Sequence, residues 1–121
     1  MKIASVLENQ KIEKRIAITP EIAKKYISLG LEVILSKNYA SHLGIPDKEY
    51  ESLGAKILGD NEVINQADII VQVGLLSNDK SSLLSEGQTL IGVLNPYENK
   101  AELDNFVKKK INIFSLELLP R

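Results

Sequence analysis

Residues 68–73 read Asp-Ile-Ile-Val-Gln-Val, which is the strongest strand signal in the chain. The run is short, rich in β-branched residues and followed by Gly74, so the sequence predicts a buried strand here. Apolar runs of the same kind recur before and after it, separated by turn residues or by stretches with helical periodicity. We expect strands at residues 2–7, 32–36, 55–58, 68–73, 89–94 and 111–116.

Helices are expected between these strands. Thr19 is placed to cap a helix that Pro20 begins and Gly30 ends, because Thr accepts a main-chain hydrogen bond and Pro suits the first helical turn. A loop is predicted at residues 38–46. Further helices are predicted at residues 47–54, at 60–66 with Asp60 as the cap, from 78 or 79 onward, and at 98–110.

The alternation of strands and helices predicts the fold class. Strands joined through helices cannot form tight hairpins, so the crossovers should be right-handed and the strands mostly parallel. We expect a single α/β domain over residues 1–121, a flavodoxin-like open sheet with helices on both faces in three layers (α/β/α). Ligands of such sheets approach the carboxyl ends of the strands, so function is expected in the loops that follow them.

Composition narrows the function. Hydrophobic residues make up 44% and charged residues 26%, which predicts a globular domain with a core of aliphatic side chains. The chain has no Cys, which excludes thiolate catalysis and Cys-ligated metal, and no metal-binding cluster is evident. The net charge of -1 is spread along the chain, so nucleic acid is not an expected partner. The N-terminus has neither a secretory signal nor a membrane span, which predicts a soluble, cytoplasmic domain without direct membrane insertion.

Four polar residues fall in loops that the predicted topology brings to one edge of the sheet. Arg15 offers a guanidinium fork for a carboxylate or phosphate, and Gln72 an amide at the end of its strand. Asn95 and Tyr97 follow the next strand, where Tyr97 offers a stacking or hydrogen-bonding group. Together they predict a candidate pocket. The seven glycines form no Gly-x-Gly-x-x-Gly or Gly-Lys-Ser/Thr loop, so a dinucleotide would be anchored chiefly by another domain.

Each of these residues also has a structural interpretation. Arg15 has Glu8 and Glu13 close by in sequence for an ion pair, and Gln72 suits a hydrogen-bonded position within the sheet. The Asn-Pro pair after the fifth strand is an ordinary turn sequence. His42 is the single histidine, and without a partner motif it is typical of a solvated loop.

Three segments together resemble the N-terminal domain family of alanine dehydrogenases and NAD(P) transhydrogenases. They are residues 1–9, the run Arg-Ile-Ala-Ile-Thr-Pro at 15–20, and the final Glu-Leu-Leu-Pro-Arg at 117–121. In the resemblance, Gln72 stands where alanine dehydrogenases have a lysine and Asn95 lies near their catalytic histidine. Gln supplies no cation and Asn no proton transfer at neutral pH, so the transhydrogenase branch, and within it the α subunit, is favoured.

This branch implies a larger protein. The resemblance implies a following NAD-binding Rossmann domain absent from this chain, a homodimer, and an NADP-binding domain and membrane subunits as partners. It implies NAD(H) as the cofactor of the full-length protein and hydride transfer to NADP(H) on the cytoplasmic side of a proton-translocating complex. Arg121 matches an arginine that contacts the nicotinamide end of NAD(H). No catalytic residue and no tight cofactor binding are expected in this chain by itself.

Two other interpretations stay open from the sequence. One is the N-terminal domain of an alanine dehydrogenase or of a saccharopine- or lysine-type amino-acid dehydrogenase. The other is a non-catalytic flavodoxin-like module that binds partners through its exposed helices.

Overall fold

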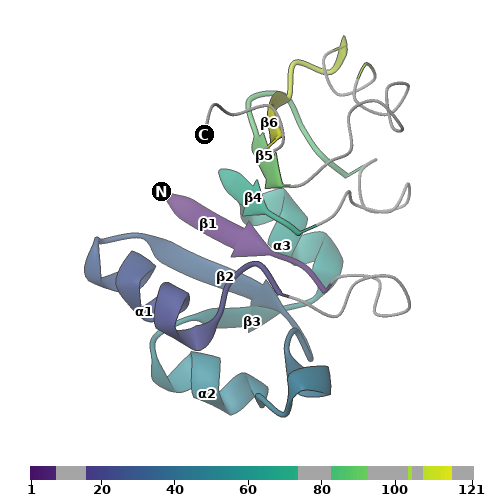
Figure 1. Ribbon diagram of the computed structural model, residues 1–121. Helices are drawn as coiled ribbons and strands as arrows, with labels where there is room; N and C mark the ends of the chain where they lie inside the picture. Colours follow the sequence, from purple (N-terminus) through teal and green to yellow (C-terminus); the bar gives the residue numbers. More distant parts are fainter. Residues whose placement is uncertain (8–15, 74–82, 93–103, 105–107, 116–121) are drawn as a thin grey trace.

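A computed structural model gives the fold of the chain and describes residues 1–7, 16–73, 83–92, 104 and 108–115 (Figure 1). Along the chain, its elements are β1 (Lys2–Ser5), α1 (Pro20–Ser28), β2 (Glu32–Ser36), the 3-10 helix η1 (Ser41–Leu43), α2 (Asp47–Ser52), β3 (Lys56–Leu58), α3 (Asp60–Gln66), β4 (Ile69–Val71), β5 (Thr89–Gly92) and β6 (Asn112–Ser115).

The six strands form one open sheet in the order β3-β2-β1-β4-β5-β6, and every neighbouring pair is parallel. The prediction of an open parallel α/β sheet is confirmed. The chain builds the sheet outward from β1 through β2 and β3, then returns to the other side of β1 with β4 (Figure 1). This is the doubly wound order 3-2-1-4-5-6, whereas the flavodoxin order is 2-1-3-4-5. We call the place between β1 and β4, where the order reverses, the switch point.

The strand register places apolar side chains on one face of the sheet against α3. Ala4 of β1 lies opposite both Ile34 of β2 and Ile70 of β4. These three buried residues pack in one cluster with Val63 and Ile64 of α3. Because successive strand residues point to opposite faces, their neighbours in sequence must face the other side.

The opposite face of the sheet is covered by α1 and α2. Ile3 of β1 and Val33 and Leu35 of β2 form a second buried cluster with Ala23 of α1 and Tyr50 of α2. Helices therefore lie on both faces, as the sequence predicts, and the three-layer arrangement is confirmed.

Helix α1 begins where its sequence predicts. Thr19 has extended backbone geometry, and its Oγ1 accepts a hydrogen bond from the Ile22 amide at 3.3 Å. Pro20 is the first helical residue, and Gly30 follows the end of the helix with a φ of +90°, a left-handed conformation that glycine adopts without strain.

Two helices differ in detail from the prediction. Asp60 is the first residue of α3 and not its cap; the cap position belongs to Gly59, and Asp60 instead places its carboxylate in the first turn, near the positive end of the helix dipole. Helix α2 ends at Ser52, two residues before Gly54, whose φ of +103° lies outside the helical region. The short helix η1 lies within the predicted loop.

The strands are shorter than predicted at the carboxyl edge. β1 ends at Ser5 and β4 at Val71, because the residues that follow hydrogen-bond with side chains in place of a regular strand ladder. The helix predicted from residue 78 or 79 lies outside the described residues. So does most of the helix predicted at 98–110, of which Asp104 and Lys108 are described and helical.

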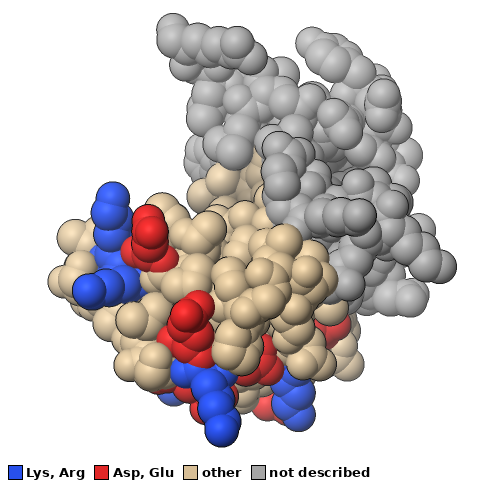
Figure 2. Space-filling model, turned by 60° about the horizontal axis from the view of Figure 1, so that its bottom comes forward, with Lys and Arg blue, Asp and Glu red and all other residues tan. Residues whose placement is uncertain are grey.

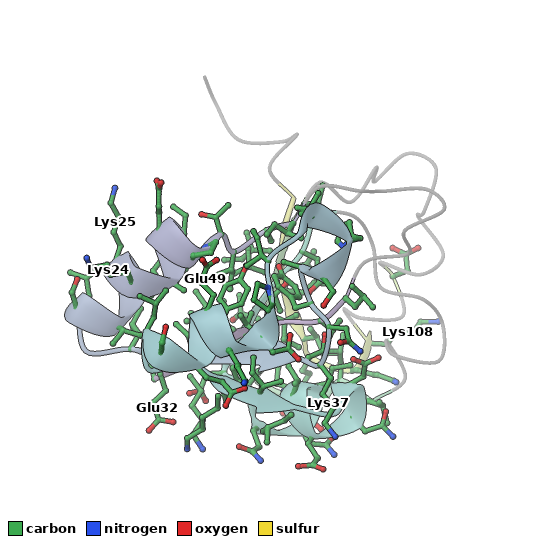
Figure 3. The ribbon with its side chains drawn as sticks, turned by 90° about the horizontal axis from the view of Figure 1, so that it is seen from below. Lys24, Lys25, Glu32, Lys37, Glu49 and Lys108 are labelled. Atoms are coloured by element: carbon green, nitrogen blue, oxygen red, sulfur yellow. The ribbon has the colours of Figure 1, made fainter. Side chains whose placement is uncertain are left out.

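Charges of both signs share the outer surface of the described part of the chain. Figure 2 shows Lys and Asp or Glu side chains interspersed on one face, and Figure 3 shows Lys24 and Lys25 projecting from α1. Lys56 pairs with Glu32 at 4.0 Å, with both side chains more than half exposed, so this ion pair adds little stability. None of the helices in the described part of the chain has the length and apolar character needed to cross a bilayer.

Candidate functional site

Buried polar side chains gather at the carboxyl edge of the sheet. Among the described residues these buried side chains are Ser5, Ser36, Gln72 and Gln88. Ser5 and Ser36 end β1 and β2, and Gln72 directly follows β4, whereas Gln88 precedes β5 at the opposite edge. Three of the four therefore lie at the edge where open parallel sheets bind ligands, and two of these border the switch point.

Gln72 binds the end of β1 across the switch point. Its Oε1 accepts hydrogen bonds from the Val6 amide and the Ser5 hydroxyl, both at 2.8 Å, and its Nε2 donates to the Val6 carbonyl at 3.1 Å. Its own amide donates to the Ile91 carbonyl of β5 at 2.8 Å. Only a neutral amide both accepts from and donates to Val6 in this way. With 3% of its surface exposed, Gln72 thus joins β1, β4 and β5.

Tyr39 extends this network to the segment that leads into α1. Its hydroxyl accepts hydrogen bonds from the amides of Ala17 at 3.0 Å and Ile18 at 3.1 Å, and it donates to Ser5 Oγ at 2.8 Å. Ser5 in turn donates to Gln72. We call this series of buried side chains the Tyr39–Ser5–Gln72 chain. Because its polar groups are hydrogen-bonded inside a low-dielectric core, the chain specifies the local geometry strongly.

Tyr50 secures the same segment from α2. Its hydroxyl donates to the Ile18 carbonyl at 2.8 Å, and its ring packs edge to face against Tyr39 with ring centroids 6.0 Å apart. Burial raises the pKa of the Tyr50 phenol well above its ordinary value, and Tyr39, Glu49 and Asp47 raise it further. Tyr50 is therefore a neutral donor throughout the physiological pH range.

Of the residues predicted for a pocket, the structure describes Gln72 alone. Arg15, Asn95, Tyr97 and Arg121 lie outside the described residues, so their convergence and any contact of Arg121 with a cofactor stay predictions. The structure does confirm the topology on which that convergence depends. Strands β1, β4 and β5 are parallel neighbours, so the segments that follow them leave the sheet at one edge.

His42 lies in η1, beyond the end of β2, and is partly exposed. It takes part in an interaction and is not an isolated side chain. The region around η1 is held by Asp47, whose two carboxylate oxygens accept from the Asn38 amide at 3.1 and 3.0 Å. Within the described ranges, no three His, Cys, Asp or Glu side chains gather in a way that suits a metal ion.

Sequence reasoning missed Ser5, Ser36, Tyr39 and Tyr50. One signal was present: Ser5 and Ser36 are polar residues at the carboxyl ends of otherwise apolar runs, where a hydroxyl can replace a ladder partner. Ser36 does so, since its Oγ accepts from the Leu7 amide at 2.7 Å. The tyrosines gave no such signal, because their hydroxyls bind main-chain groups 21 to 32 residues away in sequence.

The fold and this edge define a class of protein: a doubly wound α/β domain whose switch point is closed by a neutral, buried hydrogen-bond network. Comparison with known proteins is consistent with this class and narrows it. Residues 5–121 match the family model described as "Alanine dehydrogenase/PNT, N-terminal domain". The chain belongs to this family, and the resemblance seen in its sequence is confirmed.

Two relatives lie on the transhydrogenase side of the family. The first of the proteins that make up the NAD(P) transhydrogenase α subunit of Rickettsia prowazekii is 38% identical over 126 residues, covering 100% of this chain and 33% of the relative. The crystal structure of transhydrogenase from Sinorhizobium meliloti superposes with a TM-score of 0.93 at 29% identity, covering 100% of this chain and 36% of the other. The chain thus spans about a third of the length of these relatives.

The alanine dehydrogenase side of the family shares the fold. A solved L-alanine dehydrogenase matches with a TM-score of 0.88 and 16% identity over 95% of the chain. At this identity the likeness shows the architecture and carries no further argument about activity.

Proposed function

We propose that this chain acts as the N-terminal domain of the NAD(H)-binding α subunit of a proton-translocating NAD(P) transhydrogenase. The observation that carries the proposal is the 38% identity to the Rickettsia prowazekii protein along the whole chain. The high structural similarity to the Sinorhizobium meliloti transhydrogenase supports it.

The described residues do not form a complete dinucleotide site. The sequence has no glycine-rich phosphate loop, and Gln72 at the switch point already holds the main chain of Val6. We therefore assign the anchoring of NAD(H) to a Rossmann domain of the same subunit. When bound, the nicotinamides supply the chemistry, in which a hydride leaves NADH and joins NADP⁺ to give NAD⁺ and NADPH. This chain's residues shape the edge beside that reaction.

The proposal brings partners with it. Besides the Rossmann domain, they are a second copy of the subunit, an NADP-binding domain and the membrane subunits that move protons. The location is then the cytoplasmic side of the membrane. Arg121 is the proposed contact of this chain with the nicotinamide end of NAD(H).

The related alternative is an alanine, saccharopine or lysine-type dehydrogenase. Such a site must hold the carboxylate of an amino or keto acid, for which a cation is the fitting partner. At the switch point the described side chain is the neutral amide of Gln72, whose oxygen and nitrogen both bind β1 and the residue after it. This observation favours the transhydrogenase.

A chimera tests the proposal. Residues 1–121 replace the matching third of the Rickettsia prowazekii protein, which is combined with the remaining transhydrogenase subunits of that organism. We expect NADH to reduce a thio analogue of NADP⁺, followed by absorbance, at a rate comparable to that of the unmodified protein. A folded chimera that transfers no hydride, or one that oxidises alanine with NAD⁺, contradicts the proposal.

A further inference from the structure

The two main-chain positions that flank residues 8–15 are both held by buried side chains. On one side, Val6 is bound by Gln72 and Leu7 by Ser36. On the other side, Ala17 and Ile18 donate to Tyr39. The connection between β1 and α1 therefore leaves the switch point and returns near it from two fixed points.

These two points are also bonded to each other. From the amides of Ala17 and Ile18, the path runs through the Tyr39 hydroxyl and the Ser5 hydroxyl to the Gln72 amide, and from there to both main-chain groups of Val6. Tyr39 and Ser5 have no exposed surface and Gln72 has 3%. Water therefore cannot readily replace a missing member, and loss of one group leaves its neighbours unpaired.

We propose that Tyr39, Ser5 and Gln72 are positioning residues that couple the two ends of the β1-to-α1 connection at the switch point. The inference rests on the proposed function, because the reaction that benefits is hydride transfer at this edge. The residues act by fixing the main chain of Val6 and of Ala17–Ile18 relative to β4. Since hydride transfer is sensitive to displacements of about 1 Å, a shift here lowers the rate with little change in cofactor affinity, which another domain supplies.

The chain offers a matched control in Tyr50. Tyr50 is a second fully buried tyrosine, and it also binds Ile18, but through the carbonyl and from α2. Its hydroxyl donates to that carbonyl and not to Ser5 or Gln72. Tyr39→Phe and Tyr50→Phe each remove one buried hydroxyl, so both variants lose stability for the same reason, but only the first interrupts the coupled series.

A gentler variant interrupts the series at its middle. Ser5→Ala removes the link between Tyr39 and Gln72 but leaves the bonds of Tyr39 to Ala17 and Ile18 and those of Gln72 to Val6. Ser52→Ala is its control, because Ser52 is exposed and its Oγ donates only within α2, to the Glu49 carbonyl at 2.8 Å. If Tyr39→Phe fails to fold, Ser5→Ala still tests the inference.

The first measurement is amide hydrogen exchange in the 121-residue chain. Tyr39→Phe and Ser5→Ala should each accelerate exchange of the Val6 amide about tenfold, whereas Tyr50→Phe and Ser52→Ala should leave Val6 unchanged. Equal exchange at Val6 in all four variants overturns the coupling. This readout does not depend on any cofactor.

The second measurement is hydride transfer in the chimera. Tyr39→Phe and Ser5→Ala should lower the turnover rate about tenfold with an unchanged Kd for NADH, and the two control variants should retain the wild-type rate. If Tyr39→Phe and Tyr50→Phe lower the rate equally, the role is merely structural and the inference is wrong. If the wild-type chimera is inactive while Val6 responds as expected, the proposed function fails and the coupling stands.

Discussion

At the scale of the residue, Gln72 shows how a side chain predicted for a pocket also serves the fold. The sequence left two interpretations open, a ligand-facing amide and a hydrogen-bonded residue of the sheet. The structure shows the second: Gln72 is buried, and its amide pairs with both main-chain groups of Val6. Contact of Gln72 with a ligand stays a prediction.

A substitution at Gln72 tests whether neutrality and the donor group both matter. Gln72→Glu keeps an acceptor for Val6 but loses the donor to its carbonyl and buries a charge at neutral pH. We expect a loss of about 1 to 3 kcal/mol in the free energy of unfolding at pH 7, and partial recovery near pH 5 as the carboxyl gains a proton. Urea unfolding at the two pH values measures it. Gln66→Glu, an exposed change on α3, should cause no comparable loss.

Tyr50 gives a prediction about alkaline stability. Its pKa is raised in the folded state, chiefly by burial, so folding favours the protonated phenol. The stabilisation it provides is fully present below the ordinary tyrosine pKa of about 10 and declines as pH rises above that value toward the folded pKa. Urea midpoints measured from pH 8 upward should therefore fall more steeply in the wild type than in Tyr50→Phe above pH 10. Parallel curves for the two proteins would show that Tyr50 ionises as freely in the folded state as in the unfolded one.

At the scale of the element, local signals located most strands and helices, and tertiary contacts decided their ends. Thr19, Pro20 and Gly30 mark α1 in the sequence because each acts on its own backbone neighbours. The end of β1 was not predictable, since it depends on Gln72, which lies 66 residues away from Val6. Asp60 was misassigned as a cap because Gly59, a weaker cap residue, holds the extended position before α3.

The end of α3 provides a test at this scale. Gln88 lies before β5, and its Nε2 donates to the carbonyls of Ile64 at 2.6 Å and Ala67 at 2.8 Å, while its Oε1 accepts from the Ser85 amide at 2.7 Å. Gln88→Leu leaves these three groups without that partner, so we expect a loss of about 1 to 3 kcal/mol in unfolding free energy. Thermal or urea unfolding measures it, with Gln66→Leu on the exposed face of α3 as the control. A loss no larger than that of the control would contradict the capping role.

At the scale of the whole molecule, the class of fold was predictable and the site was predictable in part. The alternation of apolar runs and helical segments in the sequence indicates an open parallel sheet. The strand order is not encoded in any local pattern, because it depends on which strands pair after folding. The buried tyrosines were unpredictable for the same reason: Tyr39 and Tyr50 bind the main chain of Ile18, far from them in sequence.

The family and the network together assign this domain a supporting role. It belongs to the alanine dehydrogenase/PNT N-terminal domain family and spans about a third of its transhydrogenase relatives. Its described switch point is built from neutral groups that bind one another and the main chain. We infer that the domain positions an edge beside the nicotinamide and leaves the anchoring of the dinucleotide to another domain.

An NADH titration tests this account most directly. NADH fluorescence is followed as the cofactor is added to the 121-residue chain and, separately, to the chimera that carries the remaining two thirds of the Rickettsia prowazekii relative. The account predicts saturable binding by the chimera and at least about a hundredfold weaker binding by the chain alone, because the phosphate-binding loop lies outside it. Equal affinity of the two proteins for NADH would contradict the account.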